Sequence, residues 1–172
     1  MKTIFKNSFY RALFVLFICF LNMNAQSILD PAAKLDTIAV GIQQPEGPVW
    51  KDGVGLLFSD IQAAKIYRWE SGNSSSVFME RSDSTNGLAY DLQGRLIAGQ
   101  MGKRRIVRFE EDGTQTDLAS KYQGKRFNSP NDLVVKSDGS IFFTDPDFNI
   151  PVGGTAEIII GGKRIKGIYR IS

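Results

Sequence analysis

The stretch FNSPNDLVVKSDGSIFFTDP, from Phe127 to Pro146, contains the pattern that decides the fold. An Asn-Asp pair stands directly before a run of β-branched residues, a turn with glycine follows, and a second apolar run comes after it. Two apolar runs joined by a short polar turn with glycine are typical of a β-hairpin. The stretch therefore predicts two antiparallel strands, with Asn131 at the entrance to the first.

Much the same phrase occurs twice more, earlier in the chain. Glu46, Asn86 and Asn131 take one shared place in the three copies, and the residues that start there read EGPVW, NGLAY and NDLVV. The copies start 40 and 45 residues apart. Ten residues after the shared place each copy enters a second apolar run, and the tripeptides IYR, IVR and IYR mark a third. An insertion, Asp147 to Gly167, delays the last tripeptide; it favours a surface loop with a short strand at Ile158 to Ile160.

Sheets that recur every 40 to 50 residues are the signature of a β-propeller. One such sheet has two faces to cover, and stacking against its neighbours buries them. We therefore predict an all-β fold, a β-propeller of which this chain holds about three blades. A β-sandwich is the alternative, but a sandwich would not require similar residues at fixed offsets. No amphipathic helix is predicted after residue 25.

The first 25 residues differ from the rest. They combine a basic start, an apolar run from Ala12 to Leu21 and a small residue, Ala25, at the end. This is the layout of a secretory signal peptide, and the apolar run is too short to span a bilayer comfortably. An uncleaved anchor and a lipoprotein attached through Cys19 are the alternatives. The prediction is an exported protein, periplasmic or extracellular and free of the membrane after cleavage, divided into a signal peptide, a lead-in and a partial propeller at residues 1–25, 26–37 and 38–172.

Charge and composition exclude several kinds of chemistry. The formal charge of +3 comes from 21 basic and 18 acidic residues, and three of the basic ones lie in the leader. The rest of the chain is therefore neutral, and no nucleic-acid partner is predicted. The chain has no histidine, and its single cysteine lies in the leader. This excludes a Ser-His-Asp triad, a Cys-His pair and a histidine-ligated metal site, and it leaves oxygen ligands, which suit hard cations such as Ca²⁺ or Mg²⁺.

The repeat also predicts where a site would lie. The first strand of every propeller blade runs along the central channel, so residues at the shared place point toward one axis. Glu46, Asn86 and Asn131 are therefore expected to converge there as a cation cage or a sugar-binding site. The alternative is that they only form turns before strands, although glutamate forms turns poorly. Asp60 and Asp145, which end the second strands, are expected to accept hydrogen bonds from backbone amides.

Three stretches together carry a family resemblance. The segments PEGPVW…LLFSDIQAAKIYRW, NGLAYDLQGRLIAGQMGKRRIVRF and GKRFNSPNDLVVKSDGSIFFTDP resemble the gluconolactonase, regucalcin (senescence marker protein) and luciferin-regenerating enzyme-like family, over residues 38–172. The resemblance implies a six-bladed propeller with one divalent cation, commonly Ca²⁺, with Mg²⁺, Mn²⁺ or Zn²⁺ as alternatives. It also implies hydrolysis of a small-molecule sugar lactone or related ester, while some relatives cleave phosphoesters. Three blades do not close a ring, so the chain is expected to be the N-terminal half of a longer protein; assembly of two halves is the alternative.

The resemblance carries over to individual residues. Glu46 matches a metal ligand, and Asn131 matches a residue that faces both metal and substrate. Asn86 and Arg126 match substrate-binding places, and Met101 stands in the pocket where many bacterial members have a histidine. The family's other ligands come from its fourth and fifth blades and have no counterpart here. The aspartate among them is the expected acid/base, so the catalytic residue would lie beyond the end of this chain.

Three functions remain open at this point. The first is a metal-dependent lactone hydrolase in which the cation polarises the ring carbonyl and a carboxylate activates water. The second is a non-catalytic propeller that binds a glycan or a protein partner through its central face. The third is an inactive truncated product.

Overall fold

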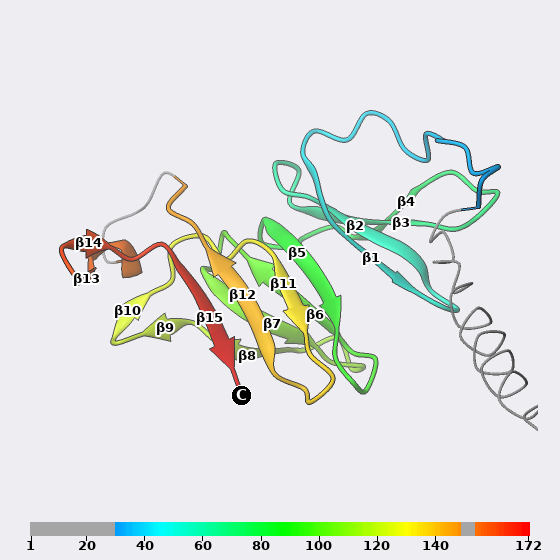
Figure 1. The fold of residues 1–172 in the computed structure, drawn as a ribbon. Coiled ribbons are helices and arrows are strands. Elements are labelled where there is room, and N and C mark those ends of the chain that lie inside the picture. Colours follow the sequence, from blue (N-terminus) through cyan, green and yellow to red (C-terminus); the bar gives the residue numbers. More distant parts are fainter. Residues whose placement is uncertain (1–29, 149–153) are drawn as a thin grey trace, which may run out of the picture. The chain divides into compact units, whose positions relative to one another are not determined.

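The computed structural model describes residues 30–148 and 154–172 (Figure 1). The chain divides into two compact units, Met1–Asp36 and Thr37–Ser172, and the second contains every strand found among the described residues. The predicted signal peptide and the start of the lead-in lie outside the described residues. Within the ranges that are described, no helix is both long enough and apolar enough to cross a bilayer.

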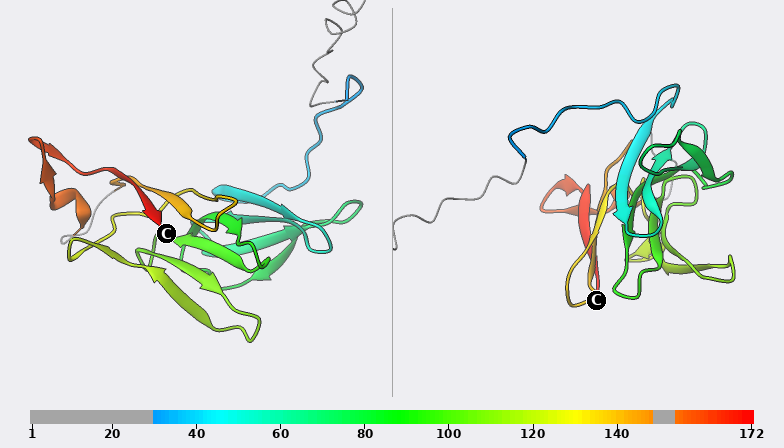
Figure 2. Two further views of the ribbon diagram at one scale, coloured as in Figure 1. Left: turned by 60° about the horizontal axis from the view of Figure 1, so that its bottom comes forward. Right: turned by 90° about the vertical axis from the view of Figure 1, so that its right-hand side faces the viewer.

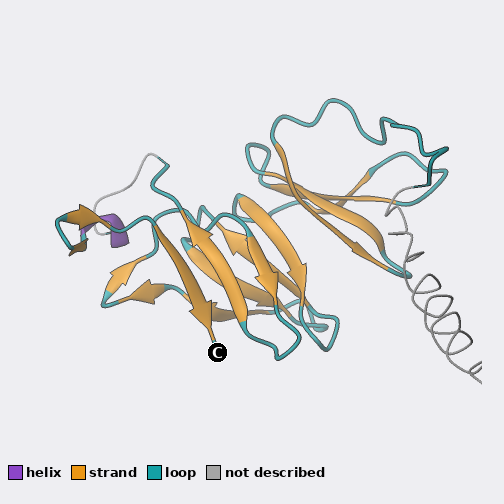
Figure 3. Ribbon diagram, viewed as in Figure 1, coloured by secondary structure: helices purple, strands orange, loops and turns teal. Residues whose placement is uncertain are grey.

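The described chain is built almost entirely of strands (Figure 3). Its helical content is one 3-10 turn, Thr155–Glu157, as expected from the lack of an amphipathic pattern. The strands of the three large sheets are β1 (Pro45–Lys51), β2 (Gly55–Asp60), β3 (Lys65–Trp69), β4 (Ser76–Met79), β5 (Thr85–Tyr90), β6 (Leu96–Gln100), β7 (Arg105–Phe109), β8 (Gln115–Ala119), β11 (Leu133–Val135), β12 (Ile141–Asp145) and β15 (Gly167–Ile171). Two small hairpins consist of β9 (Lys121–Tyr122) with β10 (Lys125–Arg126) and β13 (Ile159–Ile160) with β14 (Lys163–Arg164).

The three large sheets are the three copies of the repeat, and the predicted propeller blades are confirmed. The strand orders are β1-β2-β3-β4, β5-β6-β7-β8 and β11-β12-β15, with antiparallel neighbours throughout. The repeat predicted three strands in each copy, whereas the first two sheets have a fourth, β4 and β8. These outer strands are largely exposed, so packing constrains their sequences weakly and SVFM bears little likeness to QTDLA.

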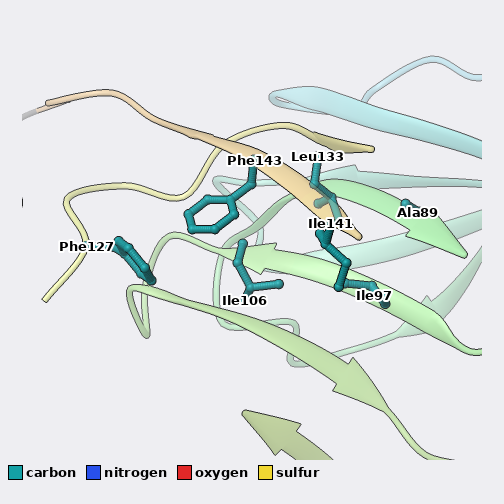
Figure 4. Packing of buried hydrophobic residues seen from close by; sticks show 7 residues of the cluster. All are labelled: Ala89, Ile97, Ile106, Phe127, Leu133, Ile141 and Phe143. Atoms are coloured by element: carbon teal, nitrogen blue, oxygen red, sulfur yellow. The ribbon is translucent and has the colours of Figure 1, made fainter. Parts of the chain in front are cut away.

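The second sheet is buried on both faces. Its alternate residues pack against the first sheet in one cluster, formed by Leu57, Ile66, Leu88, Leu96, Ala98 and Val107. The remaining apolar residues pack against the third sheet in a second cluster, formed by Ala89, Ile97, Ile106, Phe127, Leu133, Ile141 and Phe143 (Figure 4). Successive strand residues point to opposite faces, which explains why all five residues of β6 are buried. Stacking therefore supplies the cover that a single blade lacks.

Two glycines allow the first strands of neighbouring blades to approach closely. Gly47 has φ +52°, and a Cβ placed on it would lie 2.3 Å from the carbonyl oxygen of Asn86. A Cβ on Gly87 would lie 2.6 Å from the carbonyl oxygen of Asn131. Each glycine directly follows the shared place of its own copy and packs on the shared place of the next. Backbone therefore meets backbone at this point of the stack.

The insertion after β12 is only partly the expected surface loop. Its short strand is confirmed as β13, which pairs with β14. Thr155 and Ala156, however, are buried. The Thr155 hydroxyl donates to Asp145 Oδ2 over 2.8 Å, and the Ala156 amide donates to Asn128 Oδ1 over 3.0 Å. These contacts bind the insertion to the blade, a long-range effect that the glycine-rich sequence does not reveal.

The close approach at Gly47 predicts a large loss of stability for Gly47→Ala. The matched control is Gly53→Ala, because Gly53 also has a positive φ, +77°, but has nothing within 4 Å of its Cβ position. Both substitutions share a conformational cost of about 1 kcal/mol, and overpacking should add about 1–3 kcal/mol at Gly47 alone. Urea unfolding followed by circular dichroism measures the difference. Equal costs at the two positions would contradict this account of the stack.

Candidate functional site

Backbone contacts connect the residues at the shared place from one blade to the next. The Ser59 hydroxyl lies within hydrogen-bond distance of two carbonyl oxygens, 3.1 Å from that of Glu46 and 2.8 Å from that of Asn86. The Gly87 amide donates to the carbonyl oxygen of Asn131 over 2.7 Å. The expected adjacency of these three positions in neighbouring blades is thus present in the backbone.

Their side chains lie in different surroundings. Asn86 is 2% exposed, and its amide nitrogen donates to Met101 Sδ over 3.4 Å, so two predicted site residues touch. The Glu46 side chain is exposed. Asn131 is half-buried and lines a cavity of about 350 Å³ together with Thr144 and Lys166, among others. Within the described residues, the side chains of Glu46 and Asn131 make no hydrogen bond, so their carboxylate and amide oxygens are available to a ligand.

The turn after β6 joins two of the predicted substrate-binding residues. It begins with Met101, which contacts Asn86, and the carbonyl oxygen of Lys103 accepts a 2.7 Å hydrogen bond from Arg126 Nη2. Arg126 ends β10, is exposed, and also forms a parallel bridge with Gly154 of the insertion. The structure therefore gathers Asn86, Met101 and Arg126 around one turn.

Arg104, in the same turn, is a residue that the sequence did not single out. It is 6% exposed, has φ +60°, and donates from Nε to the carbonyl oxygen of Phe127 over 2.5 Å. Burial lowers the pKa of its guanidinium and nearby Arg126 lowers it further, while Asp145 and Glu157 act in the opposite direction. Arg104 thus fastens the loop before Asn131 to the second blade. The sequence GKRR contains no sign of which basic residue is buried.

The two strand-end aspartates anchor the loops that carry the shared place. Asp60 accepts hydrogen bonds from the amides of Gln43 and Gln44, at 2.9 and 3.2 Å. Asp145 accepts them from the residues at the same offsets in the third copy, the amides of Asn128 and Ser129, at 2.9 and 2.8 Å. The expected role of these carboxylates is therefore the one observed. They hold Glu46 and Asn131 in place.

The second blade replaces this carboxylate with an amide. Gln100 is fully buried, and its Nε2 donates to the carbonyl oxygen of Ser82 over 3.2 Å. Its Oε1 accepts a 2.7 Å hydrogen bond from Arg105 Nε. The loop before Asn86 is thus anchored through a carbonyl rather than through amides. Asp83 and Ser84 in that loop have positive φ values, 56° and 52°.

The two aspartates differ in their ionisation. Burial is the largest influence on Asp145 and raises its pKa, although Asn128, Thr155 and Ser129 donate hydrogen bonds to it. Burial acts in the same direction on Asp60, but donors led by the Gln43 and Ala63 amides outweigh it and lower the pKa.

The oxygen donors at the shared place suit a hard cation but cover only part of its coordination shell. Among the described residues, no group of three or more His, Cys, Asp or Glu side chains could hold a metal ion. Glu46 offers a carboxylate and Asn86 and Asn131 offer amide oxygens, whereas Ca²⁺ takes six to eight oxygen ligands. These residues fit as one part of a cation site, and their roles as ligands stay predictions.

Repeated four-stranded sheets, stacked through their first strands, define the chain as part of a β-propeller. Residues 44–172 match the family model described as the SMP-30/gluconolactonase/LRE-like region. The chain belongs to this family, whose propeller has six blades, and it holds about three of them.

Relatives agree with this assignment. A gluconolactonase of Zymomonas mobilis subsp. mobilis is 32% identical over 161 residues, which cover 85% of this chain and 45% of the relative. The solved structure of a gluconolactonase from Xanthomonas campestris gives a TM-score of 0.62 at 34% identity, covering 75% of this chain and 44% of that one. A structural-genomics target provisionally classed as a gluconolactonase gives a TM-score of 0.67 at 31% sequence identity, and the match covers 83% of this chain and 49% of that one. The chain therefore spans about half the length of these relatives.

The opposite pKa shifts predict opposite pH trends for two variants. The lowered pKa of Asp60 contributes stability above its unfolded value of 3.8, which is lost as pH falls. The raised pKa of Asp145 means that ionisation opposes folding, so its contribution falls as pH rises above 3.8. Asp60→Asn should therefore lower the free energy of unfolding more near neutral pH than in acid. Asp145→Asn should lower it more in acid.

Urea unfolding from about pH 3 to about pH 7 tests both trends. Asp145→Asn also places an amide group against backbone donors, with an expected cost of about 1–3 kcal/mol at acidic pH. The exposed Asp52, replaced by asparagine, is the control. Parallel pH profiles for the two buried positions would contradict the assignment.

Proposed function

We propose that this chain forms part of an exported, cation-dependent hydrolase that opens a sugar lactone or a related ester. The observation that carries the proposal is the series of oxygen-bearing residues Glu46, Asn86 and Asn131, which lie at the start of the first strand in two neighbouring blades and two residues before it in the third. Hydrogen bonds to the backbone carbonyl oxygens of these residues connect each position to the one in the next blade. Membership of the gluconolactonase-like family supports the substrate class.

The residues of this chain would bind the ion and orient the substrate. A bound cation, Ca²⁺ by preference and otherwise Mg²⁺, Mn²⁺ or Zn²⁺, supplies Lewis-acid polarisation of a carbonyl. Glu46 and Asn131 would hold it, because within the described residues their side-chain oxygens accept no hydrogen bond. Arg126 and Asn86 would bind hydroxyl groups of a small sugar lactone or sugar acid. No described residue is assigned as the base that activates water.

Met101 limits the range of substrates in this proposal. A thioether is a weak hydrogen-bond acceptor and does not donate, so it cannot bind a substrate hydroxyl as a histidine would. Its sulfur accepts the amide of Asn86 instead. The apolar side chain of Met101 therefore lies at a place where a polar side chain would favour a free sugar. This favours a lactone or ester that presents a less polar group to the turn after β6.

The same contact supports a second candidate, a propeller that binds a glycan without turning it over. In that case Ca²⁺ would still bind at the shared place and raise the melting temperature. No lactone or ester would be consumed. The basic and apolar leader, residues 1–25, supports export to the periplasm or the exterior under either candidate.

An assay of acid release tests the hydrolase. The complete six-bladed protein to which this chain is proposed to belong is incubated with gluconolactone-type substrates in the presence of Ca²⁺, and then with a strong chelator. Turnover should require the cation, and Glu46→Gln should weaken Ca²⁺ binding by at least about tenfold, as loss of a supporting group does in metal sites.

The matched control is Glu80→Gln, which changes an exposed glutamate paired with Lys65 on the first blade. This variant should leave Ca²⁺ affinity unchanged. Turnover that survives both the chelator and Glu46→Gln would exclude a cation-dependent mechanism. Stabilisation by Ca²⁺ without any turnover would favour the binding protein.

A further inference from the structure

Arg104 occupies a backbone position that does not require an arginine. Arg104 and Ala64 lie at the same offset in the second and first copies of the repeat, 18 residues after the shared place. Both have a positive φ, +60° and +51°. The amide of each also donates to the carbonyl oxygen three residues before it, over 3.2 and 3.3 Å. Because alanine forms this turn in the first blade, the turn itself does not explain the long cationic side chain in the second.

The Arg104 side chain contacts the residue that follows Arg126. Its Nε donates to the carbonyl oxygen of Phe127 over 2.5 Å, and Phe127 is itself only 2% exposed. Within the described residues, the buried Nη2 of Arg104 has no hydrogen-bond partner. Burying a cation costs free energy, and one hydrogen bond offsets only part of that cost. Stability therefore gives no reason for an arginine at this place, which favours a role in the site.

The backbone of Arg104 directs a second contact, to Arg126 itself. The Arg104 amide donates to the carbonyl oxygen of Gln100, at the end of β6, over 2.7 Å. The N–H and C=O groups of a trans peptide point in opposite directions, so this bond turns the Lys103 carbonyl away from β6. That carbonyl oxygen accepts the 2.7 Å hydrogen bond from Arg126 Nη2. Arg104 thus fixes both the main chain beside Arg126 and the acceptor of its guanidinium.

The insertion holds the other side of the same hairpin. It lies beside β9 and β10 (Figures 1 and 2), where Arg126 forms a bridge with Gly154 and Lys125 Nζ lies 2.8 Å from Glu157 Oε2. These contacts secure the hairpin but leave the Arg126 guanidinium with one hydrogen-bond partner among the described residues, the Lys103 carbonyl. Burial, and after it the charge of Arg126, lowers the pKa of Arg104, so the two cations repel each other. This repulsion keeps the Arg126 guanidinium on the exposed side.

We propose that Arg104 is a positioning residue that fixes the Arg126 guanidinium where it can bind a hydroxyl group of the substrate. Arg104 itself is buried and does not touch the ligand. The inference rests on the proposed function, in which Arg126 binds a sugar lactone or sugar acid. An arginine side chain that is held before the substrate arrives loses less freedom on binding, and this improves affinity. Loss of Arg104 should therefore weaken substrate binding and leave the chemical step almost unchanged.

Limited proteolysis of the complete protein tests the positioning without any assumption about activity. Trypsin cleaves after Arg126 when the loop opens, because the next residue, Phe127, is buried. Arg104→Ala should speed this cleavage at least about tenfold, because a hydrogen bond from a charged group is lost. Mass spectrometry measures the rate relative to cleavage after Lys136, an exposed residue in the turn between β11 and β12.

The ratio of the two cleavage rates removes any general loss of stability. The control variant is Arg108→Ala, because the Arg108 guanidinium pairs with Glu110 on the same blade and is remote from the hairpin. It should leave the ratio unchanged. A ratio that is also unchanged in Arg104→Ala overturns the proposal.

A double-mutant cycle tests whether Arg104 acts through Arg126. With gluconolactone-type substrates and Ca²⁺, Arg104→Ala should raise KM at least about fivefold and change kcat less than about twofold. In a protein that already carries Arg126→Ala, the same substitution should have no further effect. Effects that multiply in the double variant, or a loss confined to kcat, overturn the proposal. Absence of turnover in the unsubstituted protein contradicts the proposed function, and the proteolysis then decides whether Arg104 positions Arg126.

Discussion

The close approach of one blade's first strand to the backbone of the next is the interaction on which the rest depends. Gly47 packs on the carbonyl oxygen of Asn86, and Gly87 packs on that of Asn131, with no side chain between them. Any Cβ at these points would separate the strands and widen the stack. The approach sets the spacing of the blades and, with it, the spacing of the oxygen donors that lie at the start of each first strand or just before it.

Each blade depends on its neighbours to bury its apolar faces. The second sheet presents apolar residues on both faces and is buried by a neighbour on each side. Three aromatic rings pack together between the second and third blades. The ring centroids of Phe127, Phe143 and Tyr169 lie within 5.4 Å of each other. The same physics makes an unpaired edge or an uncovered face costly.

Side chains that carry carboxylate or amide oxygens have different roles in this fold according to their surroundings. Asp60 and Asp145 end their second strands and hold loop amides, so their oxygens are already occupied. Glu46 and Asn131 closely follow the loop residues whose amides these aspartates hold, and within the described residues their side-chain oxygens accept no hydrogen bond and remain free for a ligand. The carboxylates that look most reactive in the sequence are therefore structural, and the candidate donors are the residues that they position.

The sequence by itself determined the fold class, the three blades and the shared place, because a residue repeated at a constant offset must meet the same packing in every copy. It also located the anchoring aspartates and the short strand of the insertion. Only the tertiary structure decided that Arg104 is buried, that Asn86 contacts Met101, that Thr155 binds the insertion to the blade, and that outer strands complete the first two sheets. Each of these depends on groups that are distant in the chain or on exposed edges, where packing places little constraint on residue type.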